Sequence, residues 1–461
     1  MELKDTKRVY FVGIGGIGMA ALARYYIANG MAVAGYDRTE SVLTDELAAE
    51  GCFVSYSDSM DAVPEAFRHS DGTLVVYTPA VPESNVPLTF FRNGGFEIHK
   101  RAAVLGQITR ASRSLCFSGT HGKTTTSSMA AHIMHSGPVG CNAFLGGILR
   151  RYNSNLMLSS SSPYSVVEAD EFDRSFHQLT PYIAVVNATD PDHLDIYGTE
   201  EAYLESFAHF TELIRPDGAL IVHTGLKLKP RPAAGVRTYT FSRHEGDFHA
   251  ANIRIGNGSI VFDFVHPEGT ITDIELGVPV EINIDNAVAA LAAVWLTGTL
   301  TPELAREAIA SYPGVERRFQ FHLKEQGRAV IDDYAHHPDE LRQSIASVRA
   351  LYPDKKITVA FQPHLYSRTR DFAQQFADAL STADEVVMTD LYPAREKPIP
   401  GISSETIFSK IKNEKKILIS KEDFVKTMKN RNFEILLTAG AGDLSLYVPA
   451  LVEAITVGNG M

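Results

Sequence analysis

Short apolar runs alternate with stretches of helical apolar spacing along most of the chain, and this pattern predicts a protein of the α/β class. In the first part, segments 9–12, 32–36 and 74–77 read as buried strands. The apolar residues after the first of them recur at helical spacing: Met19, Leu22, Tyr26 and Ile27. We therefore predict a Rossmann-like N-terminal domain with a parallel sheet in residues 1–108.

The middle of the chain begins in the same way and then changes character. Its first predicted strands end at polar residues: 115–117, 165–167 and 183–186. From about residue 239 to 284 the apolar segments become short and alternating, as in 253–255 and 260–262, which indicates an antiparallel extension. A helix then resumes at Asn286 and runs through the only tryptophan, Trp295. We assign residues 109–314 to a central domain.

The last part of the chain returns to alternating strands and helices. Four apolar runs predict strands: 329–331, 357–360, 386–388 and 435–437. Helical spacing is clearest in one set of residues: Leu341, Ile345, Val348 and Leu351. This alternation predicts a second doubly wound parallel sheet, and so a Rossmann-like C-terminal domain in residues 315–461.

Composition narrows the class of protein. The 461 residues are 44% hydrophobic and 21% charged, as in globular proteins, and no uncharged apolar run approaches the roughly 18 residues that span a bilayer. The charged N-terminal residues lack the apolar core of a signal peptide, and three scattered cysteines form no C-x-x-C pair. We expect a cytoplasmic protein without a membrane partner. The net charge of −12 argues against a nucleic-acid partner.

The stretch from Ser118 to Thr126, SGTHGKTTT, carries the clearest chemical signal. It follows an apolar strand and opens a helical segment that ends near Gly137. Glycines allow the backbone to curl around phosphate oxygens, Lys123 adds a positive charge, and the Thr124 hydroxyl suits Mg²⁺. The spacing is shorter than in the full G-x-x-x-x-G-K-[ST] motif. The context nevertheless predicts a nucleoside triphosphate site in a P-loop ATPase-like central domain.

A second glycine cluster follows the first predicted strand. Gly13, Gly15 and Gly18 satisfy G-x-G-x-x-G, and Asp37 lies where a ribose-binding acid falls in dinucleotide-binding folds. The cluster alone is compatible with NAD, with the diphosphate of a UDP-sugar, or with tight strand–helix packing. The separate triphosphate loop favours the UDP-sugar.

Polar loops follow several other predicted strands. Glu168 ends a strand beside the triphosphate loop, where a nucleotide-bound Mg²⁺ is expected, although a solvated acidic loop has the same composition. His193 follows the next strand, and the sequence itself identifies only a polar loop there, because Mg²⁺ prefers oxygen ligands. In the last domain, Arg368 and Arg370 follow a strand, and guanidinium groups suit carboxylate or phosphate recognition.

Taken together, these motifs resemble the Mur ligase family, the ATP-dependent amide-forming enzymes of peptidoglycan precursor synthesis. The resemblance covers nearly the whole chain and depends on five segments in order: GIGGIGM (13–19), GTHGKTT (119–125), EADE (168–171), DHLD (192–195) and DYAHHP (333–338). It implies a ligase that joins L-alanine to the carboxylate of UDP-N-acetylmuramate through an acyl phosphate, with ATP and Mg²⁺. Such an enzyme serves cell wall biogenesis, cell shape and cell division, and we expect a monomer or a homodimer.

The resemblance also implies roles for individual residues. It assigns catalytic roles to Lys123, Glu168, His193, Arg318 and Asp333. It assigns ATP binding to Gly119, Thr120, His121, Gly122, Lys123, Thr124, Thr125, Asn283, Asn286, Arg318 and Asp333. It assigns Mg²⁺ binding to Thr124, Glu168 and His193. It assigns the two acceptor substrates to Gly15, Gly16, Ile17, Gly18, Asp37, Tyr334, His336, Arg368 and Arg370.

Three positions depart from the family pattern and leave alternatives open. Phe172 stands where the alanine ligases usually have serine, and an aromatic residue there is similar to the related ligase that recycles a whole tripeptide. Leu365 replaces a common arginine or polar residue, and Ile282 precedes Asn283 in place of histidine. The tripeptide ligase is therefore the first alternative, and a nicotinamide-dependent dehydrogenase built on the first glycine cluster is a more distant one.

Overall fold

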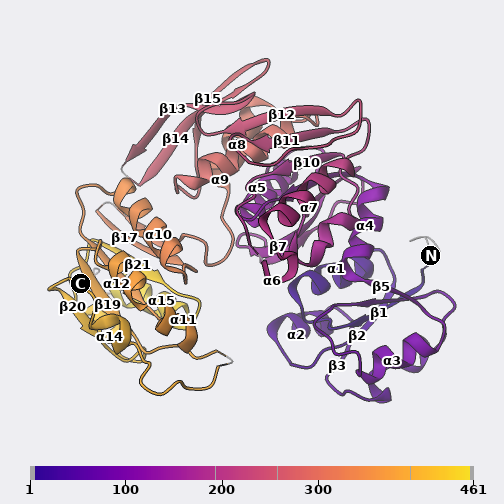
Figure 1. The fold of residues 1–461 in the computed structure, drawn as a ribbon, viewed down its shortest axis with the longest axis horizontal. Coiled ribbons are helices and arrows are strands. Elements are labelled where there is room, and N and C mark those ends of the chain that lie inside the picture. The colour runs from indigo at the N-terminus through magenta and orange to yellow at the C-terminus, as the bar shows by residue number, and fades with distance from the viewer. Residues whose placement is uncertain (1–5, 193, 257, 326, 395, 457–461) are drawn as a thin grey trace. The chain divides into compact units, whose positions relative to one another are not determined.

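The computed structural model describes residues 6–192, 194–256, 258–325, 327–394 and 396–456. Over these residues the chain forms three β-sheets with helices packed against them (Figure 1). This arrangement confirms the predicted α/β class with three sheet-containing regions. The boundaries predicted at residues 108/109 and 314/315 stay predictions.

The first sheet has the strand order β3-β2-β1-β4-β5, and all its pairings are parallel. Its strands are β1 (Arg8–Val12), β2 (Ala32–Tyr36), β3 (Phe53–Ser55), β4 (Thr73–Tyr77) and β5 (Glu97–Lys100). The helices and 3-10 turns of this region are α1 (Ile17–Ala28), α2 (Val42–Ala49), η2 (Met60–Ala62), η3 (Glu65–Phe67), α3 (Val86–Asn93) and α4 (Arg101–Ala111). Because the order reverses between β1 and β4, the loops after these strands flank the point where doubly wound sheets bind ligands.

The second sheet has the order β15-β14-β13-β12-β11-β10-β6-β9-β7-β8. Its strands are β6 (Arg113–Ser118), β7 (Asn142–Leu149), β8 (Ser154–Met157), β9 (Tyr164–Glu168), β10 (Ile183–Val186), β11 (Ala219–His223), β12 (Arg237–Ser242), β13 (Phe248–Gly256), β14 (Ser259–His266) and β15 (Gly269–Glu275). Its helices are α5 (Lys123–Ser136), η4 (Phe172–Gln178), α6 (Leu194–Tyr197), α7 (Glu200–Glu212), α8 (Ile282–Trp295) and α9 (Pro302–Ser311). Parallel pairing of β6 with both β9 and β10 places the ends of these three strands side by side.

The predicted antiparallel extension is present in part. Strands β13, β14 and β15 are neighbours joined by connections of two residues, which are too short for a parallel crossover. Strand β12, which covers the start of the predicted region, instead pairs parallel with β11. The antiparallel region therefore begins at Phe248, later than the sequence pattern indicated.

The third sheet has the order β16-β17-β21-β18-β19-β20 and is parallel except for the β16–β17 pair. Its strands are β16 (Gln320–Glu325), β17 (Arg328–Asp333), β18 (Ile357–Phe361), β19 (Glu385–Met388), β20 (Lys416–Leu418) and β21 (Ile435–Ala439). Its helices are α10 (Pro338–Leu351), α11 (Tyr366–Asp371), α12 (Ala373–Leu380), α13 (Glu405–Phe408), α14 (Phe424–Lys429), η5 (Leu444–Tyr447) and α15 (Val448–Thr456). The carboxyl ends of β17, β21 and β18 meet at one edge of this sheet.

The described chain divides into two compact units. The first comprises the described residues of Met1–Ala251, Asp263–Ile274 and Ile284–Tyr312, and the second those of Asn252–Phe262, Glu275–Asn283 and Pro313–Met461. Within the first unit one apolar core joins both sheets, because α1 packs on β1 and also on β7 (Figure 1). The rings of Tyr25 and Phe144 lie 5.4 Å apart across this contact. The glycine turn before α1 is thereby fixed to the central sheet.

Helices long and apolar enough to cross a membrane are absent from the described part of the chain.

A buried carboxyl group in the third sheet gives a prediction about stability and pH. Asp332 is 3% exposed, accepts a 2.5 Å hydrogen bond from Thr438 Oγ1, and has its pKa raised to about 6 by burial. A pKa that is higher in the folded state means that Asp332 stabilises the fold below its unfolded pKa, and that this contribution is lost as the pH rises through about 6. The Asp332→Asn variant keeps an oxygen that accepts the hydrogen bond from Thr438. We expect its free energy of unfolding, relative to that of the unchanged protein, to rise by up to about 3 kcal/mol between about pH 4 and pH 7.

Urea denaturation of both proteins across this range would measure the gain. A constant difference in stability between the two proteins would show that Asp332 does not titrate in this way.

Candidate nucleotide-binding and active site

The predicted triphosphate loop joins β6 to α5 as a tight turn. Gly119 and Gly122 have φ values of +134° and +80°, which favour glycine. A Cβ built on Gly119 would lie 2.7 Å from the backbone nitrogen of Ala188, in the loop after β10. The strand–turn–helix context is therefore the one that phosphate loops use, with the N-terminus of α5 at the turn.

Polar contacts hold this turn against the neighbouring strand ends. Thr120 Oγ1 donates to the carbonyl of Asp190 at 2.7 Å and lies 3.0 Å from the hydroxyl of Tyr203. Thr126 Oγ1 accepts from Asn187 Nδ2 at 3.0 Å. The turn is thus anchored on both sides, while His121 is exposed and Thr124 and Thr125 are half-buried on the first turn of α5.

The two predicted asparagines of α8 have different surroundings. Asn286 Oδ1 accepts a hydrogen bond from Thr126 Oγ1 at 3.1 Å, so Asn286 lies at the base of the phosphate turn. Asn283 is one turn earlier, and its amide donates to the carbonyl of Val278 at 3.1 Å. The structure therefore brings Asn286 to the phosphate turn and gives Asn283 a contact with the segment that precedes α8.

Lys123 is held by a carboxylate that the sequence analysis did not single out. Its Nζ donates to Glu171 Oε1 and to the carbonyl of Gly119, both at 2.7 Å. Glu171 is 1% exposed, and its Oε2 has no hydrogen-bond partner among the described residues. Burial raises the pKa of the Glu171 carboxyl group, and Lys123 acts in the opposite direction. The ammonium group is thus held beside the phosphate turn by a buried ion pair.

Glu168 and Thr124 together form the part of the site that suits a magnesium ion. Glu168 Oε2 accepts from the backbone nitrogen of Gly146 at 3.1 Å, and the Thr124 side chain also hydrogen-bonds the carboxyl group. Burial raises the pKa of Glu168. Mg²⁺ commonly takes one or two protein oxygens and completes its shell with phosphate oxygens and waters, so this donor pair fits the ion.

The third predicted metal ligand, His193, lies outside the described residues. Within the described ranges, no group of three or more His, Cys, Asp or Glu side chains is placed to hold a metal by itself. The nucleotide would therefore have to supply part of the coordination of any Mg²⁺ at this site.

The first glycine cluster forms the turn between β1 and α1, whose N-cap is Gly16. The backbone nitrogen of Gly15 donates to Asp37 Oδ2 at 2.7 Å, so Asp37 braces the turn instead of standing apart from it. Gly13 has a φ of +93°, and a Cβ built on it would overlap Thr78 in the loop after β4. The turn, with Ile17 and Gly18 in the first turn of α1, thus lies at the reversal of strand order, and it contains the residues that the resemblance assigned to the UDP-sugar.

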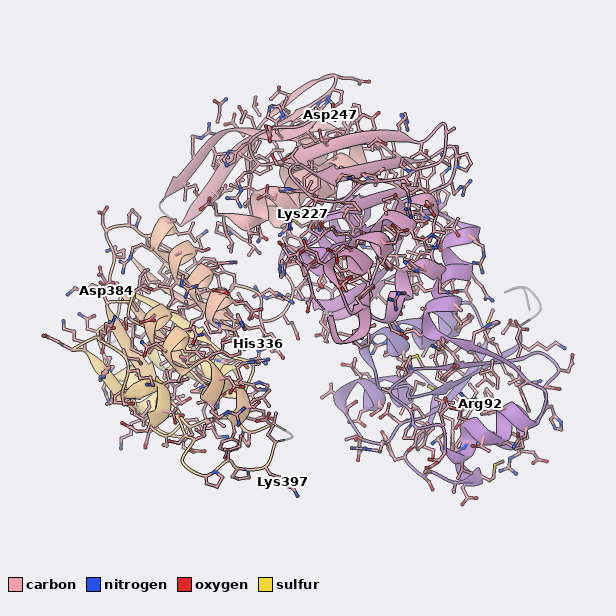
Figure 2. The ribbon with its side chains drawn as sticks, viewed as in Figure 1. Arg92, Lys227, Asp247, His336, Asp384 and Lys397 are labelled. Atoms are coloured by element: carbon pink, nitrogen blue, oxygen red, sulfur yellow. The ribbon has the colours of Figure 1, made fainter. Side chains whose placement is uncertain are left out.

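The carboxyl edge of the third sheet gathers three of the predicted substrate residues. The rings of Tyr334 and His336 lie 5.0 Å apart, and Arg368 Nη1 donates to the carbonyl of His336 at 3.5 Å (His336 is labelled in Figure 2). Arg317 places its guanidinium 4.7 Å from the centre of the Tyr334 ring. The centres of the His336 and His364 rings lie 6.1 Å apart. Arg317 and His364 were not among the predicted residues.

The remaining predicted residues of this unit are placed less directly. Asp333 accepts hydrogen bonds from the backbone nitrogen of Phe319 and from Ser344 Oγ, and burial raises its pKa while Arg318 lowers it. Arg318 itself is exposed. Arg370 is also exposed and pairs with Asp371 at 2.7 Å.

Two glycines with similar backbone conformations allow a matched test of the phosphate turn. A Cβ built on Gly122 (φ +80°) would lie 2.7 Å from Asn286 Oδ1, whereas one on Gly30 (φ +78°) would meet nothing within 4 Å. Both alanine variants bear the same backbone strain, but only Gly122→Ala also displaces the phosphate turn. We expect Gly122→Ala to weaken binding of an ATP analogue roughly tenfold, and Gly30→Ala to leave it unchanged. Titration calorimetry would measure both, and equal affinities for the two variants would contradict this account of the turn.

The chain matches known protein families and curated proteins over nearly its whole length. Residues 8–113, 117–294 and 317–451 match the Mur ligase family catalytic domain, the Mur ligase middle domain and the Mur ligase glutamate ligase domain, respectively. The chain is 56% identical over 452 residues to UDP-N-acetylmuramate–L-alanine ligase from Phocaeicola vulgatus and 57% over 454 residues to that from Parabacteroides distasonis, each match covering 98% of both chains.

Solved structures agree with these matches. The UDP-N-acetylmuramate–alanine ligase from Thermotoga maritima superposes with a TM-score of 0.77 at 26% identity, covering 98% of this chain and 99% of that one. A murein peptide ligase from Psychrobacter arcticus superposes with a TM-score of 0.62 at 19% identity, covering 97% and 98% of the two chains, which shows a shared fold.

Proposed function

Because the chain belongs to the Mur ligase family, we propose that it joins the amino group of L-alanine to the carboxylate of UDP-N-acetylmuramate, with conversion of ATP to ADP and phosphate. The observation that carries this proposal is the identity of 56–57% to the two relatives of that name over 98% of the chain. The enzyme acts in peptidoglycan precursor synthesis, in the cytoplasm, where ATP is available, as a monomer or a homodimer.

The reaction needs activation, because a carboxylate is a poor electrophile. An oxygen of the muramoyl carboxylate attacks the γ-phosphorus of ATP, the bond to the β-phosphate oxygen breaks, and an acyl phosphate and ADP result. The neutral amine of L-alanine then attacks the acyl carbon, the carbon–oxygen bond to phosphate breaks, and the nitrogen loses a proton as the amide forms. Placing and neutralising charge is the main task of the protein in such a phosphoryl transfer.

The contacts of the central site support roles for its residues in that task. The turn from Gly119 to Thr125 holds the triphosphate, and Lys123 leaves its resting partners to neutralise charge on the β- and γ-phosphates. Mg²⁺, held by Thr124 and Glu168 with His193 as a further ligand, would supply additional positive charge there. Asn286 supports the turn from α8.

The acceptor substrates are assigned to the other two predicted groups. The turn from Gly15 to Gly18 binds the UDP diphosphate at the N-terminus of α1, and Asp37 holds the turn in shape. Tyr334, His336 and Arg368 bind the muramoyl carboxylate and the amino acid, with Arg370 nearby in sequence. Arg318, Asp333 and Asn283 serve the nucleotide end of the reaction.

One alternative acceptor keeps support from a particular residue. Phe172, the position that departs from the alanine ligases, is 47% exposed on the acidic loop after β9, where a larger acceptor could contact it. The alternative is the ligase that attaches a whole tripeptide to the same nucleotide sugar. The dehydrogenase alternative loses its basis, because all three family matches are to ligase domains.

A phosphate-release assay with mass detection of the UDP-linked product tests the proposal. We expect ADP, phosphate and UDP-N-acetylmuramoyl-L-alanine only when ATP, UDP-N-acetylmuramate and L-alanine are all present. Preferential product formation with the tripeptide would support the alternative acceptor. ATP hydrolysis without a new UDP-linked product would overturn the ligase assignment.

A further inference from the structure

Arg101 reaches the glycine turn from a different part of the chain. It is the first residue of α4 and follows directly on β5, at the same carboxyl edge of the first sheet as the turn between β1 and α1. A Cβ built on Gly18 would lie 2.9 Å from Arg101 Nη1 and 3.3 Å from its Cζ. Gly18 does not have a positive φ, so its backbone conformation does not require glycine. The absence of a side chain instead leaves room for the Arg101 guanidinium group.

The guanidinium group has few partners for its hydrogen-bond donors. Its one charged neighbour within the described ranges is Asp170, with Nη2 and Oδ2 4.0 Å apart, which is too far for a hydrogen bond. The Arg101 side chain is only 29% exposed, so much of it is withdrawn from water. A guanidinium carries five N–H donors in a planar fork that matches phosphate oxygens.

The charge balance of the turn calls for such a cation. Asp37 already places a carboxylate on the Gly15 nitrogen, 2.7 Å away. A diphosphate bound at this turn therefore meets the partial positive charge of the α1 N-terminus together with a full negative charge. Arg101, which lies beside Gly18, supplies a positive charge.

We propose that Arg101 binds the diphosphate of the UDP-linked substrate, and that Gly18 is a glycine because the Arg101 guanidinium must cross the first turn of α1. This assignment rests on the proposed function for the identity of the substrate.

The closest alternative is a surface ion pair between Arg101 and Asp170 without a ligand. Pairs of this kind contribute little, so neutralising Arg101 would then change neither substrate binding nor stability by much. The two accounts differ in what they predict for the KM of the nucleotide sugar.

Steady-state kinetics of the full-length enzyme with three variants tests the proposal. We expect Arg101→Gln to raise the KM for UDP-N-acetylmuramate roughly tenfold or more while the KM for ATP stays unchanged. Arg101→Lys keeps the positive charge but loses the planar pair of N–H donors. Its KM for UDP-N-acetylmuramate should lie between those of the unchanged enzyme and Arg101→Gln. Arg110→Gln is the matched control, because Arg110 is exposed at the other end of the same helix.

Gly18→Ala gives a second, independent test, because it displaces the guanidinium without removing its charge. It should raise the same KM, and the double variant Gly18→Ala/Arg101→Gln should be no worse than the more severe single variant. Calorimetric titration with UDP alone should show the same losses in affinity. An unchanged KM and UDP affinity in Arg101→Gln, in an enzyme that makes the alanine product, would overturn this assignment and leave the proposed function standing. A different outcome would overturn the ligase assignment alone. In that outcome the parent enzyme makes no UDP-linked product, but Arg101→Gln still binds UDP more weakly than the parent does.

Discussion

The Lys123→Ala variant is expected to lose about 10³-fold or more in kcat/KM for ATP, since charge neutralisation at the γ-phosphate is the main contribution of the protein to phosphoryl transfer. Lys123 is the one ammonium group that the phosphate turn itself carries, and its Nζ already lies 2.7 Å from the Gly119 carbonyl. Phosphate release with saturating UDP-N-acetylmuramate and L-alanine would measure the loss. Near-normal turnover at saturating ATP would contradict the role of Lys123.

A stability control is needed, because the substitution also breaks a buried ion pair. Removing one member of such a pair leaves the other charge uncompensated, which costs about 3–5 kcal/mol. The double variant Lys123→Ala/Glu171→Gln removes both charges and should recover most of the lost stability while remaining inactive. Lys227→Ala is the matched surface control, because Lys227 (labelled in Figure 2) forms a solvent-exposed ion pair with Glu200 at 2.7 Å. Recovery of activity in the double variant would show that the single variant had only misfolded.

The sequence predicted those parts of the fold whose signals are local. Buried strands such as β1, β6 and β10 each contain a continuous apolar run, of three residues in β6 and four in β1 and β10, and each ends at a turn or polar residue that sequence reasoning recognises. Edge strands lack this signal. β16 and β20 are partly exposed and carry lysine or glutamate, so only their pairing with β17 and β19 defines them as strands. The β19–β20 pairing joins residues about thirty positions apart, and the β16–β17 hairpin is identified only through its partner, because the polar residues of β16 give no strand pattern of their own.

The candidate site shows the same division between local and non-local information. The phosphate turn and Glu168 were predictable because strand, turn and helix follow one another within a few residues. Which acid of the EADE segment faces Lys123 was not predictable. Strand β9 ends at Glu168, so the alternation of inward and outward side chains that a strand provides does not extend to Asp170 and Glu171. Glu171 could therefore not be distinguished from Asp170 by position.

A similar conformational effect separates Arg317 from Arg318. The sequence analysis chose Arg318 from the family pattern, but Arg317, with a φ of +55°, is the residue that donates to the carbonyl of Gly440 at 2.7 Å and covers the Tyr334 ring. Arg101 carried no local signal of any kind, since only the neighbourhood of α1 and α4 brings it to Gly18. Residues of this sort become visible only when the packing of helices on the sheet is known.

The Glu168→Gln variant is expected to lose roughly 10²-fold in kcat/KM and to need at least about tenfold more Mg²⁺ for half-maximal activity. Glutamine keeps an oxygen that can accept from the Gly146 nitrogen and the Thr124 side chain, so the loop should hold its shape while the charge proposed to bind the metal is lost. Phosphate release over a Mg²⁺ titration would measure both effects. Glu205→Gln is the matched control, because Glu205 pairs with Arg231 on the surface.

The pH dependence of the metal requirement separates a charge effect from a structural one. Mg²⁺ binds the deprotonated carboxylate, and burial raises the pKa of Glu168, so a proton competes with the metal at a higher pH than for an ordinary glutamate. The Mg²⁺ requirement of the unchanged enzyme should therefore rise as the pH is lowered, and the requirement of Glu168→Gln should change less. Parallel pH curves for the two proteins would place the magnesium ion elsewhere, because the titrating group would then be present in both.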